Sequence, residues 1–244
     1  MRIIIARDYC DMSKKAANMV AAQILLKPDS VLGLATGSTP VMTYKYLIKL
    51  FQDETISFRN VVTVNLDEYI GLNKENPNSY HYFMQDTFFN HIDIKLDNIH
   101  IPNGTAADLE RECKEYERKI QENDGIDLQV LGIGSNGHIG FNEPDLKFEG
   151  ITHCIDLDEE TIKANARFFE KEEEVPRRAI TMGVKTIMNA RKIILLANGA
   201  GKAQTVFKAI HGKIDPALPA SILQLHPDVT FILDQEAACY IINQ

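Results

Sequence analysis

The chain has 244 residues, of which 45% are hydrophobic and 25% are charged, the proportions of an ordinary globular protein. These values exclude a disordered protein, a collagen-like fibre and a small disulfide-stapled scaffold. The 26 Lys and Arg residues against 34 Asp and Glu give a net charge of −8, which provides no general attraction to nucleic acid or to an anionic membrane. An anionic ligand would therefore need a local cluster of hydrogen-bond donors.

Neither the N-terminus nor the cysteines indicate secretion. The segment MRIIIARDYCD has only a short apolar run and no small-residue cleavage site. No stretch approaches the roughly 18 apolar residues that span a bilayer. The four cysteines are scattered without a CxxC pair, which is typical of thiols in a reducing compartment. We expect a cytoplasmic protein without a membrane segment.

Short apolar segments alternate with amphipathic segments along the chain. The segments that predict strands are 3–5, 31–35, 61–64, 128–133, 193–197 and 229–233. Those that predict helices are about 8–27, 40–52, 79–91, 106–122, 158–168 and 201–211. Near-continuous Val, Ile and Leu runs suit parallel strands that are buried on both faces, and the alternation of strand and helix implies right-handed βαβ crossovers.

This pattern predicts an α/β fold with a mostly parallel sheet and helices on both of its faces, a Rossmann-like arrangement of three layers. No Gly/Ser-rich linker interrupts the chain, so we expect one domain over residues 1–244. Residues from about 145 to 180 are less regular, and we expect them to form a flexible lid over the edge of the sheet.

Four of the predicted strands run directly into loops that are rich in glycine and polar residues. These loops are 36–40, 65–69, 134–144 and 198–203. In open α/β sheets, ligands bind outside the carboxyl ends of the strands. We therefore expect the four loops to converge on one crevice that forms the active site.

Two of these loops have the features of an anion site. In the loop 36–40 a glycine allows close approach, two hydroxyls can donate, and free N–H groups at the start of the next helix favour phosphate. Lys202 begins a predicted helix after the glycines of 199–201, and a cation there opposes the helix dipole unless an anion lies between them. A plain capped turn is the alternative for each loop. The GxxxxGK[ST] pattern is missing, so a nucleoside triphosphate is not implied.

The other two loops carry candidates for acid–base catalysis. Asp67 and Glu68 follow an apolar strand, where partial burial would raise the pKa of a carboxyl group as a general base requires, although Asp67 could equally cap the next segment. Histidine is the residue type whose ordinary pKa lies near neutrality, and Glu143 could orient His138. A structural histidine and a metal ligand are the alternatives for His138, but neither an HExxH spacing nor a third ligand is present.

Six segments together resemble one family, the glucosamine-6-phosphate deaminases, also called glucosamine-6-phosphate isomerases. The segments are LGLATGSTP (32–40), VNLDEYIGL (64–72), NPNSYHYFM (76–84), LGIGSNGHIGFNEP (131–144), ANARFF (164–169) and LQLHPDVT (223–230). The combination of LDEY with GHIGFNEP is specific, whereas the TGST loop alone is weak. The resemblance implies conversion of glucosamine 6-phosphate and water to fructose 6-phosphate and ammonia in amino-sugar catabolism, without a metal or an organic cofactor.

The resemblance also implies a role for each candidate residue. His138, supported by Glu143 and Asn136, would open the pyranose ring, and Asp67 would move a proton from C2 to C1 of the open-chain sugar. The substrate phosphate would be bound by Thr36, Gly37, Ser38, Arg167 and Lys202. Many members have Asp at the position of Asn136, so we expect Glu143 to provide more of the support here.

A second departure concerns regulation. The longer members are hexamers that N-acetylglucosamine 6-phosphate activates through a small Ser, a basic Arg/Lys pair and a C-terminal extension. Here Leu146, His153 and Ile155 stand near the Ser and the basic pair, and the chain ends at Gln244. We expect a short, non-allosteric form that is a monomer or a small homo-oligomer.

Two rival functions fit the sequence less well. A 6-phosphogluconolactonase has a similar fold and a Gly-x-Gly-x-x-Gly-His loop, but small hydroxyl residues would be expected where this chain has IGFNE at 139–143. A sugar-phosphate-sensing transcription regulator would need a helix-turn-helix region and a basic face, which a first strand near Arg2 and a net charge of −8 do not provide.

Overall fold

The central element is a seven-stranded sheet in which all pairings are parallel, in a computed structural model that describes residues 1–169, 171 and 174–242. The strand order is β1-β10-β9-β6-β2-β3-β5. The strands are β1 (Arg2–Ile5), β2 (Val31–Leu34), β3 (Val62–Asn65), β5 (Ile99–His100), β6 (Leu128–Leu131), β9 (Ile193–Ala197) and β10 (Val229–Leu233). The prediction of a mostly parallel sheet is confirmed.

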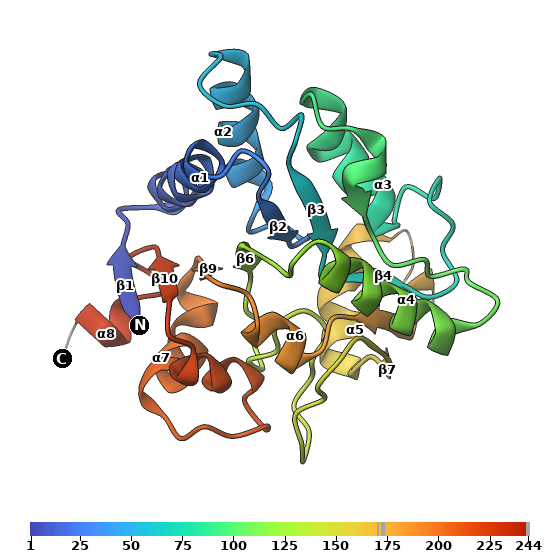
Figure 1. Ribbon diagram of the computed structural model, residues 1–244. Helices are drawn as coiled ribbons and strands as arrows, with labels where there is room; N and C mark the ends of the chain where they lie inside the picture. Colours follow the sequence, from blue (N-terminus) through green and yellow to red (C-terminus); the bar gives the residue numbers. More distant parts are fainter. Residues whose placement is uncertain (170, 172–173, 243–244) are drawn as a thin grey trace.

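Helices cover both faces of this sheet, so the predicted three-layer arrangement is also confirmed (Figure 1). One face carries α1 (Tyr9–Leu26), α2 (Val41–Gln52) and α3 (Tyr80–Thr87), and the other carries α4 (Leu109–Glu122), α6 (Val184–Met188) and α7 (Ala203–His211). An apolar cluster fills the space between the sheet and the helices on each face. In β9, Ile194 and Leu196 belong to the cluster under α1, α2 and α3, whereas Ile193 and Leu195 belong to the cluster under α4, α6 and α7. Burial on both faces explains why this strand is continuously apolar.

Several helices begin or end at other residues than the sequence predicts. The segment 79–91 divides into α3 and the 3₁₀ turn η1 (Phe89–His91), because the backbone of Phe88 leaves the helical region. The segment 106–122 becomes helical only at Leu109, since Asp108 caps the helix by accepting the N–H of Arg111. The other short elements are η2 (Leu96–Asn98), η5 (Ala200–Lys202), η6 (Pro219–Leu225) and α8 (Cys239–Ile242).

A second, antiparallel sheet was not predicted. It has the order β4-β8-β7, with β4 (Asp67–Tyr69), β8 (Arg178–Thr181) and β7 (His153–Asp156). The helix expected at 158–168 is α5 (Glu159–Asn165) followed by η3 (Ala166–Phe168), and it packs on this sheet in a third apolar cluster with Tyr69 and Phe141. Much of the segment 145–180 is therefore regular. Residues 170, 172 and 173 of this segment lie outside the described residues, and its movement as a lid remains a prediction.

Among residues 1–169, 171 and 174–242, no helix combines the length and the apolar character that a bilayer-spanning helix requires. No group of three or more His, Cys, Asp or Glu side chains in these ranges is arranged to hold a metal ion.

Asp127, just before β6, bonds to β2, to the end of α1 and to the segment before β9. Its carboxylate, only 4% exposed, accepts the N–H of Val31 at 2.8 Å and pairs with Lys27 at 2.7 Å and Arg191 at 3.2 Å. We expect Asp127→Ala to lower the free energy of unfolding by about 2–4 kcal/mol, because a buried N–H and two cations lose their acceptor. Urea denaturation measures the loss. Asp156→Ala, which removes a carboxylate that is 90% exposed, should leave the urea midpoint unchanged, and equal losses in the two variants would contradict the argument.

Candidate active site

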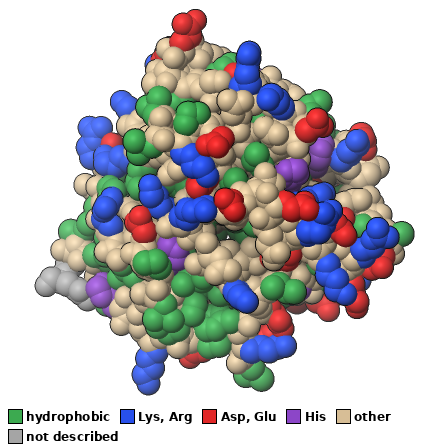
Figure 2. All heavy atoms as spheres, viewed as in Figure 1, with side chains coloured by type: hydrophobic (Ala, Val, Ile, Leu, Met, Phe, Trp, Pro, Cys, Tyr) green, Lys and Arg blue, Asp and Glu red, His purple; other side chains and the backbone are tan. Residues whose placement is uncertain are grey.

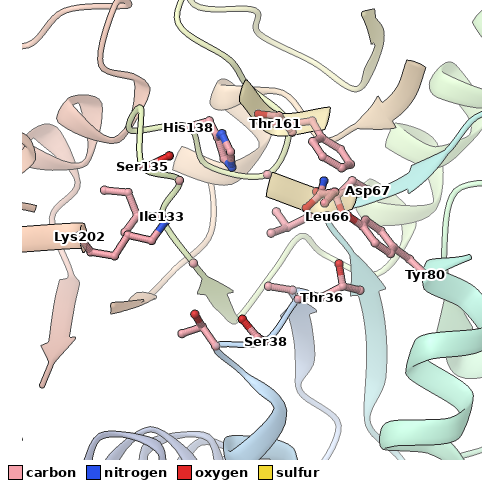
Figure 3. Close-up of a pocket in the computed structure, with 18 of the residues that line it drawn as sticks. Thr36, Ser38, Leu66, Asp67, Tyr80, Ile133, Ser135, His138, Thr161 and Lys202 are labelled. Carbon is pink, nitrogen blue, oxygen red and sulfur yellow. The ribbon is translucent and has the colours of Figure 1, made fainter. Parts of the chain in front are cut away.

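As predicted, the polar loops after β2, β3, β6 and β9 meet at the carboxyl ends of these strands, around a cavity of about 210 Å³ (Figure 3). Figure 3 shows Lys202 reaching in from one side, Asp67 and Tyr80 on the opposite side, and His138 and Thr161 across from Thr36 and Ser38. Seven of the nine predicted site residues line the cavity: Thr36, Gly37, Ser38, Asp67, His138, Arg167 and Lys202. The other two, Asn136 and Glu143, contact one another and His138.

One end of the cavity is rich in hydrogen-bond donors. Gly37 adopts a φ of 90°, which allows the loop to turn before Pro40 caps α2. The N–H groups of 37–39 donate to no group in the described part of the chain. Two hydrogen bonds hold the loop: the Tyr9 hydroxyl donates to the Ser38 carbonyl at 2.9 Å, and the Thr39 hydroxyl donates to the Asn198 side chain at 3.1 Å. A fixed loop with unused N–H groups favours an anion.

Two cations reach the same end of the cavity from different segments. Lys202 is the residue that precedes α7, and Arg167 belongs to η3, with its Nη2 3.4 Å from Ser38 Oγ. Burial and the charge of Arg167 lower the pKa of Lys202. Among residues 1–169, 171 and 174–242, no carboxylate forms an ion pair with Lys202. Two neighbouring cations of this kind suit a dianion such as a phosphate ester.

Asp67 lies at the start of β4 and is only 6% exposed. Burial, with a smaller contribution from the charge of Glu68, raises the pKa of Asp67 to about 8. No group in the described ranges donates a hydrogen bond to its carboxylate, so nothing offsets the cost of burying the charge. The sequence predicted such a raised pKa, and the result is a carboxylate able to accept a proton near neutral pH.

Glu68 performs the capping role that the sequence left open for Asp67. Its carboxylate accepts the N–H groups of Tyr69, Tyr80 and His81 at 2.8, 2.9 and 2.8 Å. Two of these N–H groups belong to the first turn of α3, whose positive end favours an acceptor. Because neighbouring strand residues point to opposite sides, Glu68 turns to α3 while Asp67 turns to the cavity.

His138 is oriented by the buried carboxylate of Glu143. His138 Nδ1 lies 3.1 Å from Glu143 Oε2, and the Asn136 amide donates to the same oxygen at 2.8 Å. Thr161 donates its hydroxyl to the other oxygen, Oε1. Burial disfavours the charge of Glu143, but these donors together outweigh it and lower the pKa of its carboxyl group. An ionised Glu143 favours the proton on Nδ1 and leaves Nε2 for a ligand.

Residues 9–232 match a family model described as glucosamine-6-phosphate isomerases/6-phosphogluconolactonase. The chain belongs to this family. The resemblance drawn from the six segments is thereby confirmed.

Individual members of the glucosamine-6-phosphate isomerase/6-phosphogluconolactonase family refine the relationship. A curated glucosamine-6-phosphate deaminase from Clostridium botulinum (strain Langeland) is 60% identical over 238 residues, which cover 98% of each chain. One from Clostridium novyi (strain NT) is 58% identical and covers 98% of this chain and 99% of its own. A solved structure described as a monomeric glucosamine-6-phosphate deaminase superposes with a TM-score of 0.96 at 50% identity, over 98% of this chain and 99% of its own. The 6-phosphogluconolactonase from Trypanosoma brucei, with a TM-score of 0.77 at 21% identity over 98% of each chain, shares the fold.

Tyr80 and Thr161 line this cavity but are not among the nine site residues predicted from the sequence. The Tyr80 ring stacks on Phe141 with centroids 5.9 Å apart and forms the wall beside Asp67. Thr161 enters from α5. Tyr80 lies inside one of the resembling segments, which is a signal for its position but not for its contacts, and no pattern around Thr161 marks it.

Proposed function

We propose that this chain is a glucosamine-6-phosphate deaminase, which converts glucosamine 6-phosphate and water to fructose 6-phosphate and ammonia in amino-sugar catabolism. The observation that carries the proposal is the meeting of an anion site, a buried carboxylate of raised pKa and an oriented imidazole in one cavity. Relatives about 60% identical over nearly the whole chain, named glucosamine-6-phosphate deaminases, support the same activity.

Ring opening is the first proposed step. It requires one group that gives a proton to the ring oxygen O5 and takes one from the C1 hydroxyl, which suits an imidazole near neutral pH. His138 Nε2 is the proposed group, with Nδ1 held by Glu143. Asn136 donates to Glu143 and accepts the backbone N–H of His138 at 3.2 Å, so it supports the pair without adding charge.

Proton transfer between carbons is the second proposed step. Asp67 takes the proton from C2 of the open-chain amino aldose and returns a proton to C1, so that the enolamine becomes a ketimine. Water then adds to the ketimine carbon, and ammonia leaves. A carboxylate with a pKa of about 8 is a stronger base than an exposed one and can therefore carry the C2 proton.

An ammonia-release assay tests the proposal. The purified chain is given glucosamine 6-phosphate, unphosphorylated glucosamine and 6-phosphogluconolactone in parallel. We expect ammonia and fructose 6-phosphate from the first substrate alone. Hydrolysis of the lactone without ammonia release would instead assign the chain to the lactonase branch of its family.

The phosphate role of Lys202 predicts a change in KM. We expect Lys202→Ala to raise KM for glucosamine 6-phosphate by about 10–100-fold with little change in kcat, because a remote phosphate is bound about equally in the ground state and the transition state. Steady-state ammonia release measures both constants. Lys208→Ala, on the exposed side of the same helix α7, is the matched control. An unchanged KM in Lys202→Ala would contradict the phosphate role.

We further propose a non-allosteric enzyme that is a monomer or a small homo-oligomer. His153 and Ile155, near the positions of the family's basic pair, border a cavity of only about 20 Å³ that Asp145, Lys147 and Glu149 also line. This volume is too small for a sugar phosphate. We expect hyperbolic substrate curves that N-acetylglucosamine 6-phosphate leaves unchanged. A sigmoidal curve that this ligand alters would contradict the expectation.

A further inference from the structure

Thr161 makes an unusual contact from α5 to the proposed catalytic pair. Its side chain is buried, with 4% of the residue exposed, and its hydroxyl donates to Oε1 of Glu143. His138 and Asn136 both use the other oxygen, Oε2. Within the described ranges, Thr161 is therefore the one donor to Oε1.

The orientation of a buried carboxylate depends on donors to both of its oxygens. An ionised oxygen without a donor in this low-dielectric position would cost free energy, and the carboxylate would rotate to share its two donors between both oxygens. The hydroxyl on Oε1 removes this cost and leaves Oε2 for Nδ1 of His138. Thr161 is β-branched and buried, so its χ1 angle has few choices, and the hydrogen bond to Glu143 holds the hydroxyl at Oε1.

We propose that Thr161 is a positioning residue for ring opening, because its hydroxyl holds the Glu143 carboxylate in the orientation that fixes the Nδ1–H tautomer of His138. This inference rests on the proposed deaminase function. Ile162 packs α5 into the apolar cluster of the small sheet and keeps the helix in place without the Thr161 hydroxyl. Because the cavity then keeps its shape, we expect loss of the hydroxyl to lower kcat and to leave the affinity for the sugar phosphate unchanged.

If the hydroxyl of Thr161 were purely structural, removing a similar buried hydroxyl elsewhere would lower kcat by as much. The chain contains a matched control for this alternative. Thr152 is also buried, with 2% exposed, and its hydroxyl donates to a carboxylate, Glu117, at 2.6 Å. Neither Thr152 nor Glu117 lines the cavity. Thr152→Val thus removes the same kind of hydrogen bond away from the site.

The kinetic test compares Thr161→Val, Thr161→Ser and Thr152→Val with the wild type. We expect Thr161→Val to lower kcat for glucosamine 6-phosphate by about 10–100-fold, while Thr161→Ser and Thr152→Val stay within about threefold of the wild type. Calorimetry in ammonia-free buffer should give all four proteins the same Kd for fructose 6-phosphate within about threefold. If Thr161→Val does not fold, the pair Thr161→Ser and Thr161→Ala isolates the hydroxyl on a smaller side chain.

A spectroscopic measurement tests the same inference without turnover. The ¹⁵N shifts of the His138 ring should show Nδ1 protonated in the neutral wild type and a mixture of tautomers in Thr161→Val, with Thr152→Val like the wild type. A single, unchanged tautomer in Thr161→Val, or a kcat loss as large in Thr152→Val, overturns the inference. A wild type that releases no ammonia overturns the proposed function instead, and the tautomer shifts still decide the role of Thr161.

Discussion

Asp67→Asn is expected to lower kcat for glucosamine 6-phosphate by at least about a thousandfold, with the Kd for fructose 6-phosphate unchanged within a few-fold. Asn has nearly the shape of Asp, so the cavity keeps its form, but an amide cannot accept the C2 proton. Asp67 lies on the cavity wall. Its neighbour Glu68 does not replace it as the base, because the Glu68 carboxylate accepts three backbone N–H groups.

The measurement combines two assays. Ammonia release gives kcat, and the reaction in D₂O gives the deuterium incorporated at C1 of fructose 6-phosphate. The wild type should incorporate deuterium at C1 in those turnovers in which the proton on Asp67 exchanges with solvent before its return to the sugar, and Asp67→Asn should form no labelled product above background. Activity like that of the wild type in the variant would mean that another group moves the C2 proton.

The same substitution should affect stability in a pH-dependent way. The folded pKa of about 8 lies above the ordinary 3.8, so the folded state holds a proton on Asp67 that the unfolded chain has lost. This contribution to stability is complete below about pH 4 and is lost as pH rises through about 8. Asn does not ionise, so the variant has no such pH-dependent loss. Between pH 5 and pH 8 we expect the free energy of unfolding of Asp67→Asn to rise by about 2–4 kcal/mol relative to that of the wild type, measured by urea denaturation.

The kcat/KM of the wild type should rise about tenfold per pH unit below pH 8 and then level off. The free enzyme needs Asp67 ionised to act as a base, and its pKa of about 8 sets the end of the rise. Measurements from pH 6.5 to 9 at constant ionic strength avoid the second ionisation of the substrate phosphate, near pH 6. A profile that is flat between pH 6.5 and 8 would show that Asp67 is already ionised there.

The part of the site that follows strands directly could be predicted from the sequence. The loops after β2, β3, β6 and β9 are continuous with apolar strands, and parallel strands place their carboxyl ends at one edge. From the sequence alone, this rule predicts that Ser38, Asp67, His138 and Lys202 meet at one edge of the sheet. Arg167 was expected from the resemblance alone, because η3 does not follow a strand of the main sheet.

The features that the sequence did not indicate depend on contacts between distant segments. β4 pairs with β8 across more than 100 residues, and three- or four-residue strands without long apolar runs give no periodic signal. Asp67 and Glu68 are adjacent carboxylates with the same local context, so only the pairing of β4 and the position of α3 separate the base from the cap. The contact of Thr161 with Glu143 depends likewise on how α5 packs.

A crystal structure with fructose 6-phosphate, grown in ammonia-free buffer, would show whether the anion site and Asp67 contact the same bound sugar. We expect the phosphate within hydrogen-bond distance of Ser38 and Lys202, with C1 and C2 of the open-chain sugar about 3–3.5 Å from the Asp67 carboxylate. A phosphate bound outside this cavity, or a sugar whose C1 and C2 face away from Asp67, would contradict this expectation.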